Sequence, residues 1–201
     1  MNVQIVLFDG FDELDAIAPF EVLKRGNEAG AKFNVKLVSL HETEEVTAYY
    51  GLKIKPDSAI NLNNIPDLLI VPGGGWNHRG ETGARIEAKQ KKLPKLIKYY
   101  YEQGSIIAGV CTGGMLMAVS GITEGRTTTM HHLAAKEMTT YGCEVIGARI
   151  VEDDRLLTAR GVTSGVDLAL WLIERFAGAP TAYEVEKRLE YERRGTVWRK
   201  S

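Results

Sequence analysis

Residues 105–114 read Ser-Ile-Ile-Ala-Gly-Val-Cys-Thr-Gly-Gly, and this stretch carries the strongest structural signal in the chain. An apolar run typical of a buried strand ends at Cys111, and small residues suited to a helix start follow at once. A side chain on such a turn stands clear of the sheet, and the N–H groups of the following helix favour a thiolate beside it. The stretch therefore predicts either a nucleophile at Cys111 or a buried cysteine that acts as a small apolar residue.

Strand-like and helical patterns alternate along the chain, which is the rhythm of a parallel sheet covered by helices on both faces. We therefore expect an α/β fold, namely a flavodoxin-like three-layer α/β/α sandwich with a mostly parallel sheet. Ligands in such sheets bind at the carboxyl ends of the strands. Pro94 is expected at a helix first turn or at a kink. The strands are predicted at 3–8, 33–40, 68–72 and 105–110, and the helices at 16–29, 84–103 and 112–120.

Two hairpins are predicted outside this alternating frame. Residues 46–60 alternate around Gly51 as in a hairpin that leads into an edge strand. Residues 145–159 form a second candidate hairpin, which turns at Asp153 and Asp154.

Two helices are predicted near the C-terminus, over 166–176 and 181–194. Thr163 and Ser164 are expected to cap the first of them, and Gly178 follows its end.

Length and composition bound the classes of protein that the chain can represent. With 201 residues, 44% hydrophobic and 25% charged, the chain can bury one sizeable core, and we expect a single domain over residues 1–201. The net charge of −1 gives no electrostatic footprint for nucleic acid or for an anionic membrane. No apolar run approaches the roughly 18 residues of a membrane helix, and no basic and then apolar leader pattern precedes the first strand, so we expect neither membrane insertion nor secretion.

The two cysteines, Cys111 and Cys143, are too few for a disulfide framework. A reducing compartment suits them, so we expect a cytoplasmic protein. No zinc-type cysteine pair is present in the sequence, and we expect neither a metal nor a cofactor.

Three motifs follow one another in the sequence. The first, at 6–23, reads Val-Leu-Phe-Asp-Gly-Phe-Asp-Glu-Leu-Asp-Ala-Ile-Ala-Pro-Phe-Glu-Val-Leu. The second, at 68–75, reads Leu-Leu-Ile-Val-Pro-Gly-Gly-Gly, and the third, at 109–114, reads Gly-Val-Cys-Thr-Gly-Gly. Together they resemble the ThiJ/PfpI (DJ-one) superfamily, which is related to the type I glutamine amidotransferases, and the resemblance covers nearly the whole chain.

The resemblance implies a role for each motif. Asp15 stands at the position of the family's active-site acid, and Cys111 at the position of its nucleophile. The N–H groups of Gly74 and Thr112 would form an oxyanion hole. Without the resemblance, Asp15 could equally be a helix cap, and the glycines after Val71 could form an ordinary turn. A phosphate-binding loop is less favoured because the loop lacks the lysine of that motif.

If Asp15 meets Cys111, two ionisable groups share a proton and their titrations are coupled. The carboxyl would then stay protonated near neutrality and serve as a proton carrier for the thiolate. His131 falls where many relatives place a histidine near the nucleophile, and it could act as base or orienter. His131 and His132 could equally pack at a helix start without a catalytic role.

The residue after the nucleophile separates branches of the superfamily. PfpI-type proteases carry a histidine there, whereas this chain carries Thr112, so peptidase activity is disfavoured. The combination of Asp15, Cys111, Thr112 and His131 looks most like the isonitrile hydratase branch. It also resembles the sensor domains of AraC-type regulators, but no room for their helix-turn-helix region is expected here.

The resemblance thus implies an enzyme that hydrates a small electrophile such as an isonitrile. A glyoxalase- or deglycase-like enzyme acting on aldehydes, and a non-enzymatic cysteine sensor, remain alternatives. The expected partners are a small-molecule substrate and, by resemblance, a second copy of the chain in a homodimer.

Overall fold

The computed structural model describes residues 1–78 and 80–200. Its main strands are β1 (Asn2–Leu7), β2 (Asn34–Ser39), β5 (Ser58–Ala59), β6 (Leu68–Val71), β7 (Ile106–Val110), β10 (Ile150–Asp153), β11 (Leu156–Ala159) and β12 (Val197–Arg199). Within the described residues they form one eight-stranded sheet in the order β12-β10-β11-β7-β6-β1-β2-β5. Strands β10 and β11 pair antiparallel, and the other neighbours pair in parallel. The predicted mostly parallel sheet is therefore confirmed.

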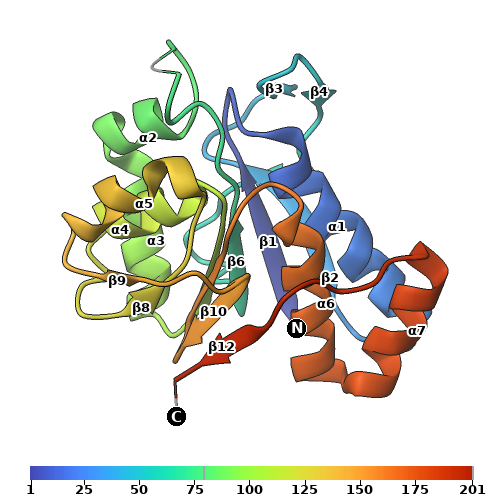
Figure 1. Ribbon diagram of the computed structural model, residues 1–201. Coiled ribbons are helices and arrows are strands. Elements are labelled where there is room, and N and C mark those ends of the chain that lie inside the picture. Colours follow the sequence, from blue (N-terminus) through green and yellow to red (C-terminus); the bar gives the residue numbers. More distant parts are fainter. Residues whose placement is uncertain (79, 201) are drawn as a thin grey trace.

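Helices cover both faces of this sheet (Figure 1). On one face α1 (Glu13–Glu28) packs against α6 (Ser164–Ala177), which packs in turn against α7 (Ala179–Leu189). The other face carries α2 (Ala84–Gln90), α3 (Lys92–Glu102), α4 (Gly113–Val119) and α5 (His132–Thr139). The predicted three-layer α/β/α arrangement is confirmed. Among the described helices, none combines the length and the apolar character needed to cross a bilayer.

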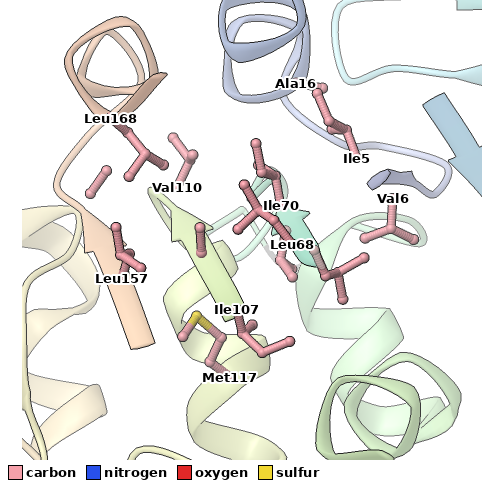
Figure 2. Packing of buried hydrophobic residues seen from close by; sticks show 14 of the residues in the cluster. Ile5, Val6, Ala16, Leu68, Ile70, Ile107, Val110, Met117, Leu157 and Leu168 are labelled. Atoms are coloured by element: carbon pink, nitrogen blue, oxygen red, sulfur yellow. The ribbon is translucent and has the colours of Figure 1, made fainter. Parts of the chain in front are cut away.

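The core lies on both sides of the central strands. All four residues of β6 are fully buried, as expected for a strand that is covered on both faces. Figure 2 shows Ile70 and Ile107 of the sheet between Leu168 of α6 on one side and Met117 of α4 on the other. This burial removes the apolar runs of the sequence from water, which is the main term that stabilises such a fold.

The chain reverses its direction of travel across the sheet at β1. From β1 the sequence first builds outward through β2 and then returns to add β6 and β7 on the opposite side. Loops at the carboxyl ends of strands separate at such a point and leave room for ligands. The turns that follow β1, β6 and β7 are the three motifs of the sequence.

Both predicted hairpins are present. Strands β3 (Val46–Thr47) and β4 (Lys53–Ile54) pair antiparallel, and β5 then joins the edge of the main sheet. Strands β10 and β11 form the second hairpin, and Asp154 adopts a left-handed φ of 62° in its turn. The start of the predicted segment instead forms β9 (Glu144–Val145), which pairs with β8 (Thr127–Thr128) in a small separate sheet.

The predicted helix over 84–103 is wrong as a single element. It consists of α2 and α3, which are separated at Lys91 with a left-handed φ of 63°. Pro94 lies in the first turn of α3, where its missing N–H leaves no helical hydrogen bond unmade. The prediction of Pro94 at a first turn is thereby confirmed.

The C-terminal predictions need two corrections. Helix α7 ends at Leu189, and the chain then returns to the sheet as β12, which pairs in parallel with β10. A three-residue strand carries too little periodicity to be visible in a sequence. The Thr163 side chain also makes no cap hydrogen bond, because its Oγ1 accepts from Arg149 Nη2 at 3.0 Å.

Candidate active site

Cys111 lies at the junction between β7 and α4. Its backbone φ is 55°, a left-handed value that is rare for a residue with a side chain. Its N–H donates to the Ala159 carbonyl of β11 at 3.1 Å, so the turn is tied to the sheet. The sharp strand-to-helix turn predicted from the sequence is therefore present, and the side chain on it is 7% exposed.

Glycines let this turn press against the loop that follows β6. A Cβ on Gly113 would lie 2.0 Å from the Val71 carbonyl oxygen. A Cβ on Gly73 would lie 2.4 Å from Thr112 Oγ1. Real side-chain atoms do not approach so closely, so the two motifs meet only because both positions lack a Cβ.

Asp15 reaches the same place from the first turn of α1. Its side chain is fully buried, and Gly73 N–H donates to its Oδ2 at 2.9 Å. The Cys111 side chain lies near enough to this carboxyl to lower its pKa. Its other oxygen, Oδ1, has no hydrogen-bond partner of normal geometry among residues 1–78 and 80–200. The backbone thus holds one oxygen of the Asp15 carboxyl. The other oxygen makes no hydrogen bond within the described residues.

The helix cap that could have explained Asp15 is supplied by Asp12 instead. Asp12 Oδ1 accepts from Leu14 N–H at 3.2 Å, and the Asp12 backbone N–H donates to the Gly73 carbonyl at 2.9 Å. Glu13 is also engaged, because its Oε1 accepts from Tyr50 N–H at 2.7 Å. Asp15 is therefore not the N-cap of α1.

The electrostatics of the pair are dominated by burial. Burial raises the pKa of Asp15 well above its usual value, and the negative charge of Asp12 raises it further. Burial also raises the pKa of the Cys111 thiol, and the Asp15 charge adds to this effect. The backbone N–H groups of Val162 and Thr112 act in the opposite direction by donating toward the sulfur.

The raised thiol pKa differs from the expectation of a thiolate favoured by the helix start. Loss of water around the sulfur outweighs the donors that face it. Because a buried pair of this kind holds a proton between its members, the anionic sulfur forms when that proton sits on Asp15.

The predicted oxyanion-hole donors are already engaged in this structure. Gly74 N–H donates to Thr112 Oγ1 at 3.0 Å, and Thr112 N–H faces the Cys111 sulfur. A developing negative oxygen would therefore have to take the place of the Thr112 hydroxyl at Gly74. The oxyanion-hole role of Gly74 and Thr112 stays a prediction.

His131 lies at the start of α5. It is the N-cap of α5, where its Nδ1 accepts from Leu133 N–H at 3.4 Å, and its ring stacks on His132 at 4.6 Å. Burial and the charge on His132 lower the pKa of His131, whereas the charge of Asp12 raises it. The structure thus gives His131 the capping role, and its catalytic role stays a prediction.

Two further features of the site were not visible in the sequence. Val162 N–H reaches the sulfur from the loop between β11 and α6. Trp76, which directly follows the glycine loop, donates from Nε1 to Glu137 Oε2 at 2.9 Å. Arg85 stacks 4.4 Å from the Trp76 ring and donates from Nη2 to the same Glu137 oxygen at 2.9 Å. This cluster ties the glycine loop to α5.

A parallel sheet with a cysteine on a sharp strand-to-helix turn and a buried carboxyl beside it defines a class of α/β proteins. Residues 1–175 match the model of the DJ-1/PfpI family, and the chain belongs to this family.

Individual relatives agree with this assignment. An isonitrile hydratase of Pseudomonas putida is 29% identical over 191 residues, which cover 95% of this chain and 78% of that protein. A glutathione-independent glyoxalase of Caenorhabditis elegans is 28% identical over 169 residues, which cover 83% of each chain. The crystal structure of Drosophila melanogaster DJ-1beta superposes with a TM-score of 0.82 at 22% identity, covering 96% of this chain and 98% of that one. The last similarity shows that the fold is shared.

Proposed function

We propose that the protein is a cysteine-dependent enzyme that adds water to an isonitrile and releases an N-substituted formamide. The observation that carries the proposal is the fully buried Asp15 carboxyl beside the Cys111 thiol. Next to them, Gly74 N–H donates a hydrogen bond to Thr112 Oγ1. The similarity to an isonitrile hydratase over 191 residues supports the same reaction. Both cysteines are free, which fits action in the reducing cytoplasm.

The first chemical step forms a covalent intermediate. The sulfur of Cys111 bonds to the terminal carbon of R–N≡C, and the proton held by the pair moves from Asp15 to that carbon. The product is a thioimidate, R–N=CH–S, attached to Cys111, and Asp15 is left as a carboxylate. N–H donation from Val162 and Thr112 stabilises the anionic sulfur that attacks.

The second step uses the carboxylate that the first one creates. Asp15 accepts one proton of a water molecule as the water oxygen bonds to the thioimidate carbon, and the second proton of that water passes from the new hydroxyl to the substrate nitrogen. The carbon–sulfur bond then breaks, R–NH–CHO leaves, and the proton on Asp15 again serves the returned sulfur. One hydration is thus divided into two easier steps.

The direct test is turnover of cyclohexyl isonitrile by the purified protein, followed by appearance of the formamide. We expect Cys111→Ala to abolish turnover and Asp15→Asn to lower kcat by at least about 100-fold, because proton transfer contributes 10²- to 10⁴-fold. Thr112→Val should be milder, about 10-fold. Cys143→Ala is the matched control, since Cys143 is the other free, buried cysteine and should leave kcat unchanged.

A second candidate is an enzyme acting on reactive aldehydes with the same pair, which the similarity to a glyoxalase over 169 residues supports. Methylglyoxal is therefore assayed in parallel with the isonitrile. Turnover of methylglyoxal without turnover of the isonitrile, or an isonitrile rate that survives Cys111→Ala, would overturn the hydratase proposal. The sensor alternative would show turnover of neither substrate, and its mark would be oxidation of Cys111 to the sulfinate.

A further inference from the structure

The loop between β11 and α6, residues 160–163, lies against the nucleophile. It directly follows Ala159, whose carbonyl accepts from Cys111 N–H at 3.1 Å. Strand β11 also pairs in parallel with β7, the strand that Cys111 ends, so the loop starts beside the sharp turn. Within the loop, Val162 N–H faces the Cys111 sulfur. The conformation of this loop therefore decides whether a backbone donor lies at the sulfur.

Arg149, which directly precedes β10, contacts both ends of this loop. Its Nη2 donates to Thr163 Oγ1 at 3.0 Å. Its backbone carbonyl accepts from Arg160 N–H at 3.1 Å. Val162 lies between these two contacts in the chain, so Arg149 limits how far the Val162 N–H can move.

A buried carboxylate fixes the guanidinium of Arg149. Asp167 of α6 is 2% exposed, and its Oδ2 accepts from Arg149 Nε at 2.8 Å and lies 2.8 Å from Nη2. The C-terminal segment adds two donors, because Tyr191 OH donates to Asp167 Oδ2 and Arg194 N–H donates to Oδ1, each at 3.0 Å. Charge-assisted hydrogen bonds of this kind favour one geometry. Asp167 therefore keeps the Arg149 guanidinium at Thr163.

The Arg149–Asp167 pair does not act on the sulfur by its own charge. The charged groups that face the sulfur are Asp15 and Asp12, and both raise the pKa of the Cys111 thiol. A buried ion pair also adds little to stability, because loss of hydration offsets much of the attraction between its members. An effect of Arg149 on the site therefore has to pass through the position of the loop.

We propose that Arg149 is a positioning residue for the nucleophile: held by Asp167, it fixes residues 160–163 so that Val162 N–H donates to the Cys111 sulfur. The inference rests on the proposed function in that Cys111 is the nucleophile, and it holds for any substrate that this sulfur attacks. An N–H donor stabilises a thiolate more than a thiol. Displacement of the loop would therefore lower the fraction of Cys111 that is anionic, and with it the reactivity of the sulfur.

The test is the rate at which iodoacetamide alkylates Cys111 from about pH 6 to about pH 10, which spans the range in which thiols ionise. Mass analysis of the peptide that contains Cys111 keeps Cys143 out of the measurement. Arg149→Met removes the guanidinium and keeps a long side chain. We expect it to move the curve of rate against pH about one unit upward, which is an about tenfold lower rate at a given pH, as for loss of a hydrogen bond to a charged group.

Thr163→Val removes only the hydroxyl that accepts from Arg149 and leaves the pair with Asp167 in place. It should slow alkylation about threefold, as for loss of a weaker hydrogen bond. This variant decides the question if Arg149→Met does not fold.

Arg126→Met is the matched control. Arg126 Nη1 lies 3.0 Å from Oδ1 of Asp153, another fully buried carboxylate, but Asp153 is the last residue of β10, whereas Arg149 precedes the first. The control removes a similar ion pair and should leave the alkylation curve unchanged. A wild-type or faster rate for folded Arg149→Met, or an equal loss in Arg126→Met, would overturn the proposal. Alkylation needs no turnover, so a protein that hydrates no isonitrile could still show the expected shift, and the two proposals fail separately.

Discussion

Asp15 holds an ionisable carboxyl in a fully buried position, and this position links the site to the stability of the protein. Its pKa in the folded state lies well above the value of 3.8 that represents the unfolded chain. Between these two values the folded state binds more protons than the unfolded state, so the free energy of unfolding falls as the pH rises. The contribution of Asp15 to the free energy of unfolding is therefore complete below about pH 4, and it is lost as the pH rises through the pKa of Asp15 in the folded state.

We therefore predict that Asp15→Asn changes stability in a pH-dependent way. The asparagine does not ionise, so the variant should gain stability relative to the wild type as the pH rises from about 4 to 8. Urea unfolding at several pH values measures the difference. A difference between variant and wild type that stays constant with pH would contradict the buried, protonated carboxyl.

The close contact at Gly113 leads to a second prediction. Gly113→Ala places a Cβ 2.0 Å from the Val71 carbonyl oxygen, and backbone on both sides has to move. We expect a loss of at least about 3 kcal/mol in the free energy of unfolding, because overpacking against backbone relaxes poorly. Gly147→Ala is the control, since a Cβ there meets nothing within 4 Å, and its effect should stay within about 0.5 kcal/mol.

The break between α2 and α3 shows how one residue divides a helix. Lys91 ends α2 with a φ of 63° and directly precedes the first turn of α3. The cost of this conformation for a residue with a Cβ is about 1 kcal/mol.

We predict that Lys91→Gly stabilises the protein by up to about 1 kcal/mol, because glycine adopts the left-handed conformation without strain. Lys89→Gly is the matched control. Lys89 is also exposed but lies inside α2, so glycine there should destabilise by about 0.5–1 kcal/mol. Thermal and urea unfolding give both values, and equal effects of the two substitutions would contradict the assignment.

The surface of the whole molecule carries an apolar patch near the start of α1. Leu14, Tyr50 and Leu52 are exposed, and Tyr50 reaches 80%. The three lie around Glu13, whose Oε1 accepts from the N–H groups of Tyr50 and Leu52. Exposed apolar side chains that gather in one place indicate a surface that another protein covers.

We expect the chain to form a homodimer through this patch. Light scattering should give twice the monomer mass of 22.2 kDa, and Tyr50→Ser combined with Leu52→Ser should shift the protein to monomer. Leu62→Ser is the control, because Leu62 is equally exposed but lies elsewhere, after β5. A wild-type protein with the monomer mass at micromolar concentration would contradict the expectation.

Local patterns in the sequence determined the parallel sheet, the two hairpins and the turn at Cys111. Such features depend on residues that are neighbours in the chain, so apolar runs and glycines at 73 and 113 are enough to indicate them. The motifs at 68–75 and 109–114 could be expected to meet, because the carboxyl ends of parallel strands lie at one edge of the sheet.

Only the tertiary structure decided which groups of the site are buried and which hydrogen bonds they make. Burial of Asp15, donation from Val162 N–H to the sulfur, and the bond from Gly74 to Thr112 each join segments that are far apart in the chain. The return of the C-terminus as β12 is of the same kind. Backbone donors and desolvation carry no residue signature, since any amino acid except proline has an N–H and burial depends on what packs above it.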